Sequence, residues 1–128
     1  MDTKHYMQDR AAEEFFSRLA EGMFQTTRCS KCGKTHYPPR VVCPHCLNED
    51  LEWVDLPRHG VLMAFTQQEA ALRCRKPDVL GMVELDGIGN IFTRIDAPFE
   101  ELRIGQKVAF DTWTSPDGIA LHQFRPID

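Results

Sequence analysis

The spacing of four cysteines constrains this chain more than any other feature. Cys29 and Cys32 form one Cys-x-x-Cys pair, and Cys43 and Cys46 form a second pair after ten intervening residues. Two such pairs are typical of a structural zinc ribbon, because each two-residue gap lets one turn aim both sulfurs at a single ion. Four thiolates fill a tetrahedron and leave no position for water. We therefore predict one structural Zn²⁺ per chain, which stabilises the fold and does no chemistry.

Other uses of the cysteines fit less well. Disulfides belong to oxidising compartments, and no signal peptide precedes these residues. A redox Cys-x-x-Cys occurs once, within a βαβ pattern that the sequence lacks. His36 and His45 are the rival zinc ligands in this region. After the two pairs, Gly33 and Asn48 are the residues that we expect in sharp turns, Asn48 in a left-handed conformation.

The expected ribbon is also cationic. Residues 28–46 include no acidic residue and four basic ones, namely Arg28, Lys31, Lys34 and Arg40. A Zn²⁺ bound by four thiolates carries a charge of about minus two, which these cations could offset. A contact surface for an anionic group is the alternative interpretation.

Composition limits the class of protein. A chain of 128 residues can hold one modest domain, or a ribbon and one small barrel. Its net charge of −4 argues against a protein that mainly coats nucleic acid. No apolar run approaches the ~20 residues that span a bilayer. With cysteines of the metal-binding kind and no targeting segment, we expect a cytoplasmic protein.

The N-terminal segment predicts an amphipathic helix. Met1 to Gln8 is polar and expected to be loosely held, Asp9 is a candidate N-cap, and Gly22 is a natural stop. The apolar residues between them recur at helical spacing, with Phe15, Phe16 and Leu19 on one stripe. These residues either pack on the chain's own barrel or contact another protein.

Short strands dominate the rest of the chain. Residues 24–28 and 51–56 read as ribbon strands, and Tyr37-Pro38-Pro39 must cross between the cysteine pairs in extended form. A junction at 57–60 precedes five strands at 61–67, 79–85, 90–95, 107–113 and 119–124, with a helical turn at 98–102. We predict a mainly β fold with an N-terminal helix at 1–24, a rubredoxin-like zinc ribbon at 25–57 and a five-stranded OB-type barrel at 58–128.

No catalytic motif is present in the sequence. It contains no nucleophile elbow, no phosphate-binding loop and no dinucleotide-binding glycine motif. Cys74 is flanked by arginines that would favour its thiolate, but it has no identifiable histidine partner. The same cluster, Arg73, Arg75 and Lys76, could bind the phosphates of a nucleic acid or of coenzyme A, or could be a solvated loop.

The order of the motifs resembles a known family. Phe15-Phe16 leads to Arg28-Cys29-Ser30-Lys31-Cys32-Gly33, then to Pro38-Pro39-Arg40, Cys43-Pro44-His45-Cys46 and Leu51-Glu52-Trp53; the barrel adds Met82-Val83-Glu84-Leu85-Asp86, residues 102–108 and Phe124-Arg125-Pro126. This order resembles the zinc-ribbon/OB-fold, acyl-CoA-associated proteins first catalogued as a domain of unknown function. The resemblance covers nearly the whole chain.

The resemblance implies a non-catalytic small subunit that a thiolase-type acyltransferase complex requires. Such a subunit would contact its catalytic partner through the helix (Phe15, Phe16 and Leu19) and the barrel, and would help to bind acyl-CoA. The four cysteines carry over as zinc ligands. The residues that contact CoA do not, because that part of the family has no fixed motif. The alternative is a nucleic-acid-binding ribbon and barrel.

Overall fold

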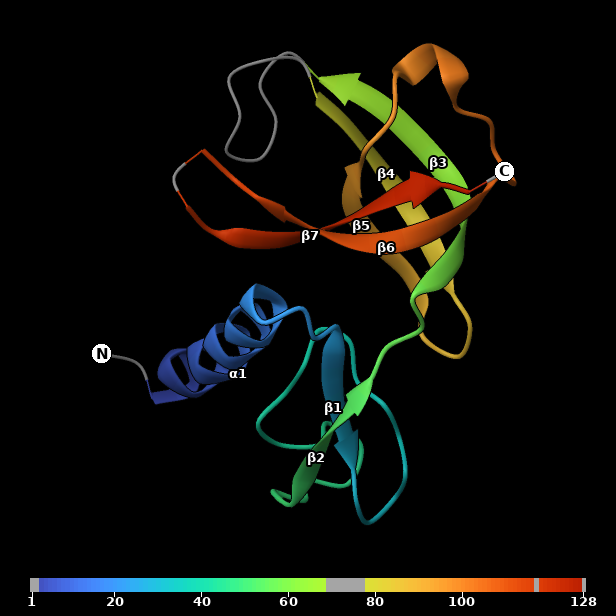
Figure 1. Cartoon of the computed structure of the whole chain (residues 1–128). Coiled ribbons are helices and arrows are strands. Elements are labelled where there is room, and N and C mark those ends of the chain that lie inside the picture. The colour runs from blue at the N-terminus through green and yellow to red at the C-terminus, as the bar shows by residue number, and fades with distance from the viewer. Residues whose placement is uncertain (1–2, 69–77, 117, 128) are drawn as a thin grey trace. The chain divides into compact units, whose positions relative to one another are not determined.

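The computed structural model describes residues 3–68, 78–116 and 118–127. The chain divides into two compact units, Met1–Leu56 and Pro57–Asp128. The first unit holds one helix and a two-stranded sheet, and the second holds a closed barrel (Figure 1). The prediction of a mainly β fold with an N-terminal helix, a four-cysteine ribbon and a five-stranded barrel is confirmed.

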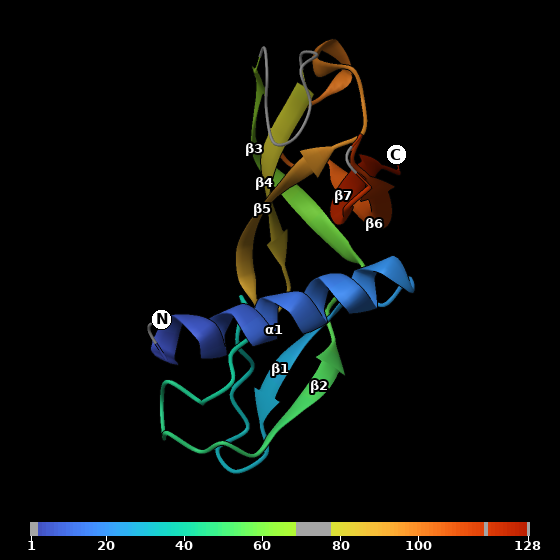
Figure 2. The same ribbon diagram turned by 90° about the vertical axis from the view of Figure 1, so that its left-hand side faces the viewer.

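Helix α1 spans Thr3–Ala20 and lies along the small sheet (Figure 2). The prediction that the helix begins at Asp9 is wrong. Residues 3–8 contain neither glycine nor proline, so nothing in them prevents the helix from starting earlier. Arg18 joins α1 to the sheet, because its guanidinium donates to Gln25 Oε1 at 2.6 Å and lies 4.6 Å from the centre of the Trp53 ring.

Strands β1 (Gln25–Cys29) and β2 (Leu51–Asp55) form the antiparallel sheet of the ribbon. The chain between them crosses back over β1, and two buried threonines of β1 hold it there. Thr26 Oγ1 donates to the carbonyl oxygen of His36, and the backbone N–H of Arg40 donates to Thr27 Oγ1 at 2.9 Å. These bonds satisfy backbone groups of a segment that has no strand of its own.

The barrel contains five strands and one short helix. The strands are β3 (His59–Gln68), β4 (Asp78–Leu85), β5 (Gly89–Ile95), β6 (Lys107–Thr114) and β7 (Ala120–Pro126). The 3₁₀-helix η1 (Phe99–Glu101) lies between β5 and β6, where a helical turn was predicted. The strands close in the order β3-β4-β5-β7-β6, with β5 and β7 parallel and the other pairs antiparallel. This topology is that of an OB fold.

Two features shape the barrel wall. The β3–β4 register shifts between Leu62 and Ala64, so Met63 is an extra residue in a bulge and remains partly exposed. At Gly60 an added Cβ would lie 2.5 Å from Val83 Cγ1 and 2.7 Å from the carbonyl oxygen of Glu84. Glycine is therefore required there for the strands to approach.

The barrel encloses an apolar core. Its fully buried side chains come from all five strands: Leu62, Val83, Leu85, Ile91, Ile95, Val108 and Phe124. Outside the core, Arg94 pairs with the buried Asp78 at 3.0 Å and stacks on Trp113, which ties β4, β5 and β6 together. No helix in the described part of the chain is both long enough and apolar enough to span a bilayer.

Candidate metal centre

The ribbon brings four cysteine sulfurs together. The Sγ atoms of Cys29, Cys32, Cys43 and Cys46 all lie within 4.8 Å of one another. Cys29 Sγ is 3.5 Å from Cys46 Sγ, and Cys32 Sγ is 3.7 Å from Cys43 Sγ. Sulfurs placed about 2.3 Å from one tetrahedral ion lie about 3.8 Å from each other. Both the geometry and the donor set therefore fit a structural Zn²⁺.

The two cysteine pairs lie in two turns of the same construction, here called the first knuckle (Cys29–Lys34) and the second knuckle (Cys43–Asn48). In the first, Gly33 N–H donates to Cys29 O at 2.9 Å and Cys29 N–H donates to Lys34 O at 2.9 Å. In the second, Leu47 N–H donates to Cys43 O at 2.8 Å and Cys43 N–H donates to Asn48 O at 2.9 Å. Each turn thus satisfies its own backbone and points two sulfurs inward.

The residue after each pair has a positive φ, +78° at Gly33 and +64° at Leu47. The prediction that Asn48 takes the left-handed conformation is wrong by one residue. The hydrogen bonds of the turn determine which residue is left-handed. The N–H of the residue directly after the second cysteine donates to the carbonyl oxygen of the first cysteine, and the backbone must turn at that residue to do so. Asn48 acts through its side chain instead: its Nδ2 donates to Cys29 Sγ at 3.5 Å and to Asp50 O at 3.1 Å.

Hydrogen bonds and burial give the thiols of Cys29 and Cys46 different pKa values. The backbone N–H of Cys32, followed by the Asn48 amide, lowers the pKa of Cys29 to about 5. At Cys46 the backbone N–H of Asn48 favours the thiolate, but burial and the three neighbouring thiols outweigh it and raise the pKa to about 11. The neighbouring thiols thus favour the thiolate at Cys29 and oppose it at Cys46, and a bound Zn²⁺ would stabilise the thiolate at all four.

Neither rival histidine belongs to the sulfur cluster of the described residues. His36 is buried on the β1 side, with its Nδ1 3.1 Å from Thr27 Oγ1, and burial is the main cause that lowers its pKa. His45 is exposed. The four cations of the ribbon are also exposed: Arg28, Lys31, Lys34 and Arg40.

The apolar stripe of α1 divides between core and surface. Phe15 and Leu19 are buried, at 5% and 1% exposed, whereas Phe16 is 38% exposed. The Phe15 ring contacts those of Phe16 and Tyr37 edge to face, with centroids 5.4 and 6.1 Å apart. Of the three residues expected to contact a partner, two are therefore used inside the chain, and Phe16 is the ring left on the surface.

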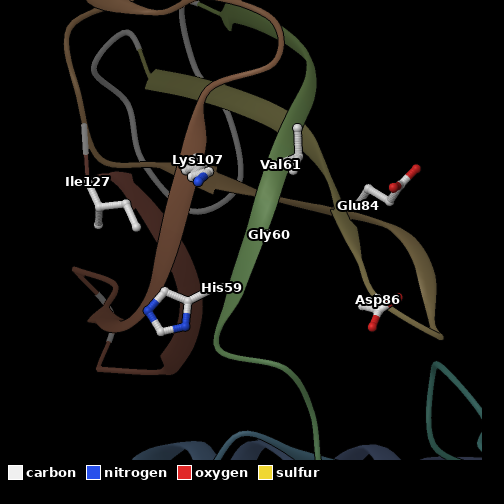
Figure 3. A pocket seen from close by; sticks show the side chains of 7 residues that line it. All are labelled: His59, Gly60, Val61, Glu84, Asp86, Lys107 and Ile127. Carbon is white, nitrogen blue, oxygen red and sulfur yellow. The ribbon is translucent and has the colours of Figure 1, made fainter.

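The barrel wall carries a groove of about 400 Å³ that the sequence analysis did not identify (Figure 3). Glu84 and Asp86 lie on one side of it, and Lys107 and Ile127 lie on the other, across β3. Such a groove can hold a ligand or side chain with an apolar body and polar ends. Only the pairing of β3 with both β4 and β6 brings these distant residues together, so no local sequence pattern could have identified the groove. Its lining residues are His59, Gly60, Val61, Glu84, Asp86, Lys107 and Ile127.

The cationic cluster Arg73, Arg75 and Lys76, and Cys74 within it, lie outside the described residues. Two described residues close to the ends of this link, Gln67 and Asp78, line a second barrel pocket of about 450 Å³.

Comparison with known proteins identifies both units. The family profile for the ChsH2 rubredoxin-like zinc ribbon domain matches residues 16–52, and that for the ChsH2 C-terminal OB-fold domain matches residues 53–112. The benzoylsuccinyl-CoA thiolase subunit BbsA of Thauera aromatica is 30% identical over 108 residues, which are 78% of this chain and 74% of BbsA.

Two solved structures share the fold. The Ltp2-ChsH2(DUF35) aldolase superposes with a TM-score of 0.77 at 23% identity, over 89% of this chain and 92% of the matched chain. A protein of unknown function from the DUF35 family of Sulfolobus solfataricus gives a TM-score of 0.64 at 20% identity, over 94% and 87% of the two chains. With both profiles matched in order and a relative at this identity, the chain belongs to the ChsH2 family of zinc-ribbon and OB-fold proteins.

Proposed function

We propose that this protein is the non-catalytic, zinc-binding accessory subunit of a thiolase-type enzyme. The observation that carries the proposal is the relative BbsA, a thiolase subunit that matches most of this chain. The sulfur cluster supports it, because four thiolates around one Zn²⁺ leave no open position at which substrate could react. The chemistry would then come from a nucleophile on a larger catalytic subunit.

Copurification tests this proposal. The full chain, isolated from the cells that produce it, should bring down a thiolase-type subunit, identified by mass spectrometry. The chain alone should not cleave a 3-oxoacyl-CoA, and the pair should. Bound nucleic acid in place of such a subunit, or turnover by the chain alone that Cys74→Ala abolishes, would contradict the proposal.

Docking through α1 is the second part of the proposal, and Phe16 supports it. The phenyl ring is 38% exposed, whereas the large apolar side chains of Phe15 and Leu19 on the same helix are buried. Phe16→Ala should weaken association with the catalytic subunit by ~1–3 kcal/mol, as for an interface anchor, with little change in the free chain's stability. Phe15→Ala is the matched control, because loss of a buried phenylalanine should cost ~3–5 kcal/mol of stability. Unchanged affinity in Phe16→Ala would rule out this docking site.

Help with acyl-CoA binding is the third part. Arg73, Arg75 and Lys76 are three cations in one short stretch, and guanidinium and ammonium groups bind phosphates well. Replacing all three with alanine should raise the KM of the complex for acyl-CoA and leave zinc content unchanged. Arg103→Ala, an exposed cation elsewhere on the barrel, is the charge control. An equal change in KM in the control would contradict a phosphate site at the cluster.

A further inference from the structure

The two knuckles differ in the residue that follows the second cysteine, and this difference points to a function. They make the same backbone hydrogen bonds, and both place the residue after the second cysteine at positive φ. The first knuckle uses Gly33 there, which has no Cβ and adopts this conformation without strain. The second uses Leu47, the only non-glycine residue with positive φ among the described residues. A branched aliphatic side chain is strained there.

In the part of the chain that the structure describes, the leucine side chain lies mostly in water, so its contacts do little to offset this strain. Leu47 is 74% exposed, the most exposed of the large apolar side chains that the structure describes. Glycine or asparagine would meet the same backbone requirement without exposing apolar surface to water. Strain that the free molecule does not recover is characteristic of binding sites, where a contact with another molecule offsets it.

We propose that Leu47 is an anchor that inserts into an apolar pocket of the catalytic subunit. This inference rests on the proposed function, since it names that subunit as the partner. The zinc cluster directly behind the turn would hold the side chain in a fixed direction, because Leu47 N–H bonds to Cys43 O and Cys43 is a candidate ligand.

Charge next to the turn favours a protein pocket over a membrane or nucleic acid. Glu49 and Asp50 follow Leu47 closely and are exposed. Two carboxylates beside an apolar anchor would be repelled by phosphate groups of a lipid surface or a nucleic acid. They suit a pocket whose rim carries basic side chains or N–H donors.

Two substitutions separate the strain of Leu47 from its apolar contact. Leu47→Asn relieves the strain and removes the apolar group, whereas Leu47→Met keeps both. In Leu47→Asn we expect the ribbon of the zinc-loaded free chain to melt about 2–8 °C higher. Its affinity for the thiolase-type subunit that copurifies with the wild-type chain should fall about tenfold to a hundredfold. Leu47→Met should resemble wild type in both measurements.

Each other outcome overturns the inference. A lower melting temperature in Leu47→Asn would mean that the leucine is stabilised within its own chain. Unchanged affinity in Leu47→Asn, with wild type binding the subunit, would mean that Leu47 is not an anchor while the proposed function stands. Failure of wild type itself to bring down a thiolase-type subunit would refute the proposed function and this partner together.

Discussion

The knuckle region and the barrel reach a fixed structure by different physical means. Between Ser30 and Asp50, the buried side chains are those of His36, Pro39 and Cys43, and no strand runs through the segment. The barrel closes all its strand edges and buries a contiguous set of Leu, Ile, Val and Phe side chains. One region is therefore held by local turns around a sulfur cluster that fits a metal, and the other by apolar burial and cross-strand pairing.

Removal of zinc should unfold the ribbon and spare the barrel. Structural zinc supplies ~10–16 kcal/mol of apparent binding energy in small modules. The chain offers one reporter for each region, because its two tryptophans are Trp53 in the ribbon and Trp113 in the barrel. With a strong chelator, or in Cys32→Ser, the Trp53 fluorescence measured in Trp113→Phe should change, and that of Trp113 measured in Trp53→Phe should not. Joint loss of both signals would contradict independent stabilisation.

Truncation of a side chain in the barrel core should destabilise the barrel and leave the ribbon unchanged. Ile91 is 1% exposed, so Ile91→Ala should lower the free energy of barrel unfolding by ~2–5 kcal/mol through lost burial and a cavity. Urea denaturation followed by Trp113 measures this, while zinc affinity should stay unchanged. Phe92→Ala on the same strand is the matched control, because Phe92 is 54% exposed and its loss should change stability by less than ~1 kcal/mol. Equal effects from both variants would argue against this core.

Acid should weaken the barrel through His122. Burial lowers the pKa of His122 from 6.5 to about 4, and its Nδ1 is 2.7 Å from Thr93 Oγ1. The unfolded chain then binds the proton more readily, so stability is present above pH 6.5 and falls as the pH drops toward 4, by about 3 kcal/mol. Urea midpoints of Trp113 at several pH values measure the slope. His122→Gln cannot titrate and should flatten it; an identical slope in the variant would exclude His122 as the cause.

Replacing a glycine that has a positive φ should lower stability slightly, and only in the region that contains the glycine. Gly33→Ala places a Cβ where the nearest atom is 3.8 Å away, so the cost comes from φ at +78° and should be about 1 kcal/mol. Gly87→Ala in the barrel, with φ at +76° and open space, should cost about the same. Zinc affinity, measured by competition with a chelator, should change in Gly33→Ala but not in Gly87→Ala. Barrel stability, measured by denaturation followed at Trp113, should change in Gly87→Ala but not in Gly33→Ala. A change in both readouts from either variant would mean that the regions are coupled.

Local patterns were enough for the fold and the sulfur cluster. Two pairs of cysteines at this spacing have few ways to place four sulfurs on one ion, and the structure brings Cys29, Cys32, Cys43 and Cys46 within ligand distance. Alternating apolar residues and turn signals located the five barrel strands to within a few residues. The start of α1 was missed because capping is a weak signal wherever the preceding residues can also be helical.

The identity and order of the elements follow from the amino-acid sequence alone, because they depend on the short-range periodicity of apolar residues and on cysteine spacing. The folded structure was needed to show which of two adjacent phenylalanines is buried, and which residue of the second knuckle takes the left-handed conformation. It also assembled the barrel groove from three strands and the segment after β7. The buried phenylalanine and the groove depend on how elements far apart in the chain pack against each other. The left-handed residue depends on the hydrogen-bond register within the second knuckle, which the cysteine spacing alone does not specify.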